Sequence, residues 1–119
     1  MDYEAEHRKL WDLIVEYVKY STIDLPKNLV EWLIVKKSLV NSMGYMSQKI
    51  RNTCFACAYV ADNNPNRYVK CVHCPLKWRR GTCNDKHSEY ADFVKALCSG
   101  ERSKAVELAK CIRDLPWED

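Results

Sequence analysis

Five cysteines lie close together in the middle of the chain, and their spacing is that of a metal site. Cys54 and Cys57 form one C-x2-C pair, Cys71 and Cys74 form a second, and Cys83 follows. A two-residue gap lets the backbone turn tightly enough for both sulfurs of a pair to reach one tetrahedral ion, about 2.3 Å from each. Two such pairs separated by a short, turn-rich insert are typical of a four-thiolate zinc site. The sequence therefore predicts a structural zinc bound by Cys54, Cys57, Cys71 and Cys74.

Other uses of these thiols stay open. Cys83, His73 or His87 could replace a member of the second pair, and thiolate pairs also hold iron. The plainest alternative is that the cysteines are simply buried or joined in disulfides, which the repeated C-x2-C spacing disfavours. A catalytic zinc needs an open coordination position and a nearby general base. The segment has few acids and no H-E-x-x-H pattern, so we expect no enzyme.

The segments on either side of the cysteines predict helices. Apolar side chains recur at three-to-four spacing over residues 4–20, which indicates an amphipathic helix on which His7 would be solvated near one end. Residues 26–43 are apolar around most of the helix circumference, so this helix should be the most buried, with Trp32 in the core. Two further helices are expected over about 85–98 and 101–114.

Between the helix pairs the sequence favours a β-hairpin. The insert at residues 61–66, ADNNPN, is rich in turn-forming residues, and RYVKC at 67–71 has the composition of a strand. The predicted fold is thus mainly α, with a small zinc-clamped β-hairpin of zinc-ribbon or knuckle type inserted between helix pairs. One domain of residues 1–119 would consist of a helix pair (1–48), the Cys-rich hairpin (49–84) and a second helix pair (85–119). The zinc would supply folding energy that a small core lacks.

Composition places the chain among intracellular globular proteins. Of its 119 residues 47% are hydrophobic and four are tryptophan, which is not typical of a disordered chain. No apolar stretch is long enough to span a membrane, and the charged opening MDYEAEHRKL is unlike a secretory signal, so we expect a cytoplasmic location. In a reducing cytosol paired cysteines are metal ligands more often than disulfide partners. Cys98 and Cys111, outside the cluster, are expected to be small core residues.

Positive charge is concentrated around the cysteines. The net charge is +3, but residues 49–87 hold eight basic side chains and only two acidic ones. Interleaved cations and aromatic rings can grip phosphates and stack on bases, or can bind a protein partner. A four-thiolate zinc centre carries a charge of about −2, so part of this excess would balance the metal centre. The candidate binding residues of this basic cluster are Arg67, Lys70, Lys77, Trp78, Arg79 and Arg80.

The motifs resemble a group of small uncharacterised zinc-binding accessory proteins encoded by phages and prophages of Gram-positive bacteria. The likeness lies in CFACAY at 54–59, CVHCPLKW at 71–78, and the HRKLW opening at 7–11. It implies an intracellular phage-type protein with no known catalytic activity. The partner it implies is a host macromolecule, most simply a host protein bound during takeover or anti-defence, with nucleic acid as the alternative.

Overall fold

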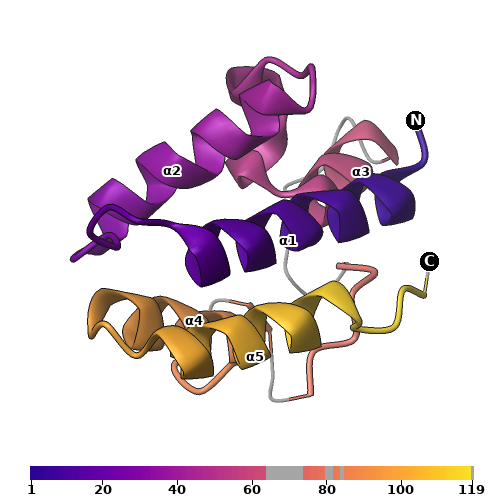
Figure 1. Ribbon diagram of the computed structural model, residues 1–119. Helices are drawn as coiled ribbons and strands as arrows, with labels where there is room; N and C mark the ends of the chain where they lie inside the picture. Colours follow the sequence, from indigo (N-terminus) through magenta and orange to yellow (C-terminus); the bar gives the residue numbers. More distant parts are fainter. Residues whose placement is uncertain (64–73, 80–81, 84, 119) are drawn as a thin grey trace.

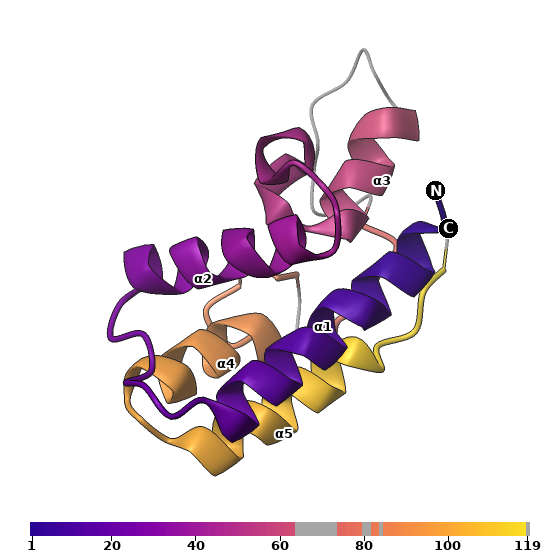
Figure 2. The same cartoon turned by 45° about the horizontal axis from the view of Figure 1, so that its top comes forward.

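The computed structural model describes residues 1–63, 74–79, 82–83 and 85–118. This part of the chain forms five α-helices: α1 (Tyr3–Tyr20), α2 (Leu29–Ser42), α3 (Phe55–Asn63), α4 (Glu89–Cys98) and α5 (Arg102–Arg113). Two short 3-10 turns, Ser47–Lys49 and Arg51–Thr53, connect α2 to α3. α1 runs through the middle of the molecule, with α2 and α3 on one side and the α4–α5 pair on the other (Figures 1 and 2).

α1 and α5 lie antiparallel, and each supplies side chains that satisfy the last carbonyls of the other. The His7 Nε2–H donates to the Ile112 carbonyl at 3.0 Å, and Arg8 Nη1 donates to the Arg113 carbonyl at 2.8 Å. At the opposite end Arg102 donates to the carbonyls of Val18 and Ser21. Cationic donors at helix C-termini also interact favourably with the helix dipoles. The expected helices over 4–20 and 101–114 are therefore confirmed, and these mutual caps join them.

An aromatic cluster packs between α1, α2 and α4. Trp11 and Trp32 each meet Phe93 edge to face, with ring centroids 5.3 and 5.1 Å apart. The Trp32 Nε1–H donates to the hydroxyl of Tyr90 at 3.0 Å, which satisfies the buried indole. The core placement of Trp32 is confirmed. α4 begins at Glu89, later than expected, because the Ser88 hydroxyl accepts from the Ala91 N–H and caps it there.

The prediction of a zinc-clamped β-hairpin is wrong. Its first half, Phe55–Asn63, is helix α3, and the described residues form no strand, only one antiparallel bridge between Leu76 and Trp117. Alanines favour a helix, and α3 buries its apolar residues against α1 instead of pairing as a strand. A short apolar run in the sequence does not reveal whether it forms a helix or a strand. The proposed second strand, 67–71, lies outside the described residues.

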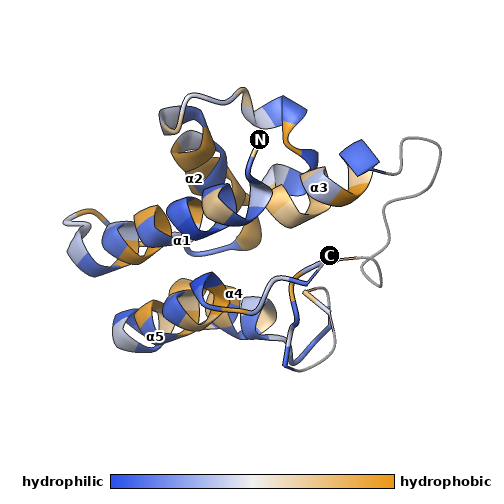
Figure 3. Ribbon diagram, turned by 90° about the vertical axis from the view of Figure 1, so that its right-hand side faces the viewer, coloured by the Kyte–Doolittle hydropathy of each residue, from blue (hydrophilic) through white to orange (hydrophobic). Residues whose placement is uncertain are grey.

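α2 also departs from expectation. It starts at Leu29 and not Pro26, because the Asn28 side chain accepts from the Glu31 N–H and forms the N-cap. It is not the most buried helix either: Trp32, Lys36 and Val40 are buried, but Leu29, Val30 and Ile34 are exposed. In Figure 3, which colours hydrophobic residues orange, α2 accordingly shows much orange although it is partly exposed. Across the described ranges, no helix combines the length and apolarity needed to cross a membrane.

Candidate metal centre

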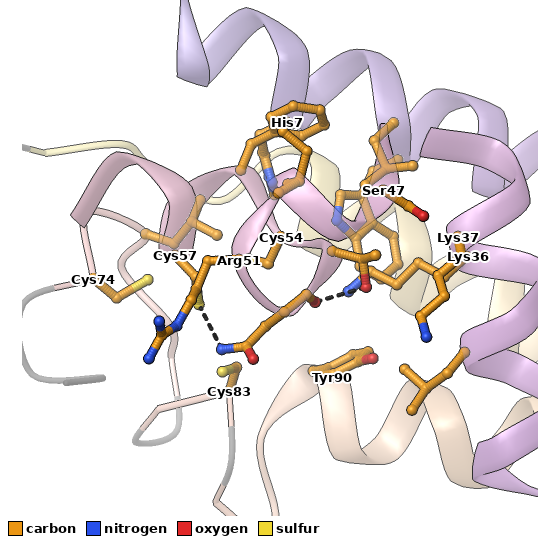
Figure 4. Close-up of a pocket in the computed structure, with 18 of the residues that line it drawn as sticks. His7, Lys36, Lys37, Ser47, Arg51, Cys54, Cys57, Cys74, Cys83 and Tyr90 are labelled. Carbon is orange, nitrogen blue, oxygen red and sulfur yellow. Dashed lines mark hydrogen bonds between the residues drawn. The ribbon is translucent and has the colours of Figure 1, made fainter. Parts of the chain in front are cut away.

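A cavity of about 640 Å³ opens between α1, α2, the start of α3 and the segment that leads into α4 (Figure 4). Aromatic and aliphatic side chains form much of its wall. Four thiols line it as well, two from the start of α3 and two from the segment before α4: Cys54, Cys57, Cys74 and Cys83. Figure 4 shows Cys57, Cys74 and Cys83 around one end of the cavity, with Lys36 and Tyr90 further along. Two segments far apart in the sequence therefore bring their thiols to one space.

The backbone before α3 is bent to deliver the first pair. Asn52 and Thr53 have positive φ angles of 56° and 47°, a left-handed conformation that is strained for a β-branched residue such as Thr53. Cys54 follows directly and stands at the N-terminus of α3, where the N–H groups of Ala56 and Cys57 favour its thiolate. Strained backbone of this kind concentrates at functional sites. Here it sets the C-x2-C pair on the first turn of a helix.

The two thiols of this pair differ in acidity. The pKa of Cys54 is lowered, first because the Cys57 thiol donates a hydrogen bond to it, and then by Lys36 and the helix N–H groups, against the opposing effect of burial. The pKa of Cys57 is raised by that same hydrogen bond and by burial. The Asn52 amide donates to the Cys57 sulfur at 3.6 Å. These contacts favour the thiolate of Cys54, the form that binds metals.

The second pair of thiols sits on a segment tied to the rest of the molecule. The Lys77 N–H donates to the Pro116 carbonyl at 2.9 Å, and the Glu118 N–H donates to the Pro75 carbonyl at 2.8 Å. Further along, the Ser88 hydroxyl donates to the Cys83 carbonyl at 3.0 Å. These bonds hold Cys74 beside the C-terminal segment and Cys83 beside the start of α4.

Three of the thiols expected to bind metal are in the described part of the chain, and they share the cavity with the substitute Cys83. Cys71 and His73 lie outside the described residues, whereas His87 is exposed and does not line the cavity. Within the described ranges, no three His, Cys, Asp or Glu side chains come close enough together to hold a metal ion. The thiols there surround a shared space without converging on one point.

The basic cluster is only partly described, since Arg67, Lys70 and Arg80 fall outside the described residues. Of the others, the Lys77 Nζ lies 3.8 Å from a carboxylate oxygen of Glu118, and Arg79 is exposed. Trp78 is half-buried against the core, and its buried indole N–H has no hydrogen-bond partner among the described residues. Part of the Trp78 ring is therefore covered by the core.

Lys36 is a site residue that sequence reasoning missed. It is only 4% exposed, lines the same cavity, and holds its Nζ 5.0 Å from the centroid of the Tyr90 ring. Burial alone would lower the pKa of Lys36, but Tyr90 and the thiols of Cys54 and Cys57 outweigh it and raise the pKa. The available signal was its spacing: Trp32, Lys36 and Val40 follow one another at four-residue intervals and so share a helix face.

Comparison of the chain with protein-family models, with curated proteins and with solved structures returned no match.

Proposed function

We propose that this protein is a small structural-zinc protein that binds a host protein. The zinc proposal is supported by one observation: thiols from two separate segments line the same cavity. These thiols are Cys54, Cys57, Cys74 and Cys83. Four thiolates saturate a tetrahedral zinc, which then crosslinks the chain and takes no part in chemistry. Cys71 remains the alternative fourth ligand, as its C-x2-C spacing with Cys74 indicates.

The cross-link would connect two segments that lie far apart in the sequence. Cys54 and Cys57 begin α3, whereas Cys74 and Cys83 belong to the segment leading into α4. Metal binding would draw these two segments together, since a preformed site is not required when binding is coupled to folding. The lowered pKa of Cys54 favours its thiolate, the form that binds a metal.

The outer face of α2 supports a protein partner. Val30 and Ile34 are 69% and 60% exposed, and Leu29 beside them is also exposed, although all three are large aliphatic residues. Aliphatic side chains gathered on a surface are typical of protein contacts and offer nothing to a phosphate backbone. The half-buried Trp78 and the proximity of Lys77 to Glu118 weaken the nucleic-acid alternative. That the partner belongs to a host cell rests on the resemblance to phage-encoded proteins.

Capture from a Gram-positive lysate on the immobilised protein tests this proposal. The test variant is Val30→Ser/Ile34→Ser, and the matched control is Lys104→Ser/Glu107→Ser on the exposed face of α5. We expect the wild type and the control to retain the same protein, and the α2 variant to lose it, because the variant removes apolar area from the contact. Retention of that protein by all three, or capture that nuclease treatment abolishes, would contradict the proposed surface.

A further inference from the structure

Lys36 is a buried cation on α2. Its side chain is 4% exposed, and among the described residues no Asp or Glu pairs with it. The Tyr90 ring lies 5.0 Å from its Nζ, and the Trp32 indole N–H donates to the Tyr90 hydroxyl. A cation–π contact returns less than the desolvation of a buried ammonium costs. A nearby anion is therefore needed to offset the charge of the Lys36 ammonium.

The cavity that Lys36 lines contains suitable groups, the thiols of Cys54 and Cys57. A zinc bound by four thiolates carries a net negative charge. We propose that Lys36 is the counter-cation of this centre, a positioning residue that stabilises the zinc–thiolate group without touching the ion. This inference rests on the proposed zinc site and deepens it.

Lys37 provides the matched control. Lys37 is the next residue of α2 after Lys36, and it also lines the cavity. Its side chain is exposed, so solvent and salt screen its charge. Removing either charge changes the net charge of the protein equally. Only the buried one should matter to the metal centre.

The test is the zinc affinity of the full chain, measured by competition with a chromophoric chelator. Lys36→Met should bind zinc at least about tenfold more weakly than the wild type, the usual scale for groups outside the ligand shell. Lys37→Met should stay within about twofold, since its charge is already screened. Lys36→Arg, which keeps the charge, should recover most of the affinity. Lys36→Gln serves in place of the Met variant if that one does not fold.

Melting temperatures with and without zinc separate this role from simple packing. A counter-cation makes Lys36→Met lose more stability in the zinc-bound form than in the metal-free form, because the zinc–thiolate centre holds more negative charge than the metal-free thiols. Equal loss of stability in both forms, with zinc affinity unchanged, would overturn the inference while leaving the zinc site intact. A wild type that binds no zinc overturns the proposed function and this inference together.

Discussion

At the scale of single residues, His7 shows how a helix contact makes stability depend on pH. The ring is 2% exposed and donates to the Ile112 carbonyl, and burial lowers its pKa from 6.5 to about 4, against the raising effect of that hydrogen bond. The expectation of a solvated histidine was wrong, since α5 covers this end of α1. Between pH 6.5 and 4 His7 binds a proton in the unfolded chain but stays neutral in the folded one. The contribution of His7 to the free energy of unfolding is therefore complete above about pH 6.5 and is lost as the pH falls.

We expect this histidine alone to reduce the free energy of unfolding by about 2 kcal/mol between pH 7.5 and pH 5. Urea unfolding at the two pH values measures the loss. His7→Gln keeps every other titrating group, including the thiols, and should show a pH-dependent loss smaller by that amount. Identical losses in the two proteins would mean that His7 is not buried in its neutral form.

At the scale of elements, α2 is where inward and outward faces are hardest to tell from the sequence. Its apolar residues surround the helix, so periodicity predicts burial without saying which side is covered. The structure turns Trp32 inward and leaves Val30 and Ile34 outside. An inward lysine at position 36 is even less expected, because lysines are almost never fully buried unless paired.

The orientation of α2 makes a direct stability prediction. Trp32→Ala should lower the free energy of unfolding by about 3–5 kcal/mol, because it leaves a cavity in the aromatic cluster. Val30→Ser/Ile34→Ser should change it by no more than about 1 kcal/mol in total, as surface substitutions usually do. Urea denaturation of the three proteins gives both values. A large loss in the double variant would place that face of α2 in the core.

The remaining helices differ in whether the local sequence is enough to predict them. α1 and α5 follow from apolar spacing, and their ends were predicted to within two residues. α3 could not be predicted, because its strand-like cysteine, phenylalanine and tyrosine outweighed three alanines, and because packing on α1 decides the outcome. Cys98 and Cys111 lie on the expected helices but are half-buried, so they are not core residues.

At the scale of the whole molecule, the candidate site depends on long-range placement that no local pattern contains. The spacing of Cys54 and Cys57 indicates a metal pair by itself. That Cys83 joins them follows only from the arrangement of α3 and the segment before α4 around one cavity. The Lys36 side chain reaches the same space from a third element, α2. These relationships depend on the tertiary packing of α1 with its neighbours.

If zinc joins these parts, loss of one ligand should destabilise the entire fold. Cys54→Ser should lower the melting temperature sharply, because metal-binding energy is folding energy at such sites. Cys98→Ala, a half-buried cysteine on α4, should cost about 1 kcal/mol or less. Thermal unfolding with zinc present compares the two. Equal and mild effects would argue against Cys54 as a ligand.

Metal analysis of the freshly purified full chain, combined with a count of free thiols, tests the central claim most directly. We predict about one zinc per chain, because one tetrahedral site consumes four thiolates. The ion should be absent from Cys54→Ser and from Cys83→Ser and retained in Cys98→Ala. Loss of zinc in Cys71→Ser but not in Cys83→Ser would keep the metal and exchange the fourth ligand. A wild type without bound metal, whose clustered cysteines are joined in disulfides, would contradict the account.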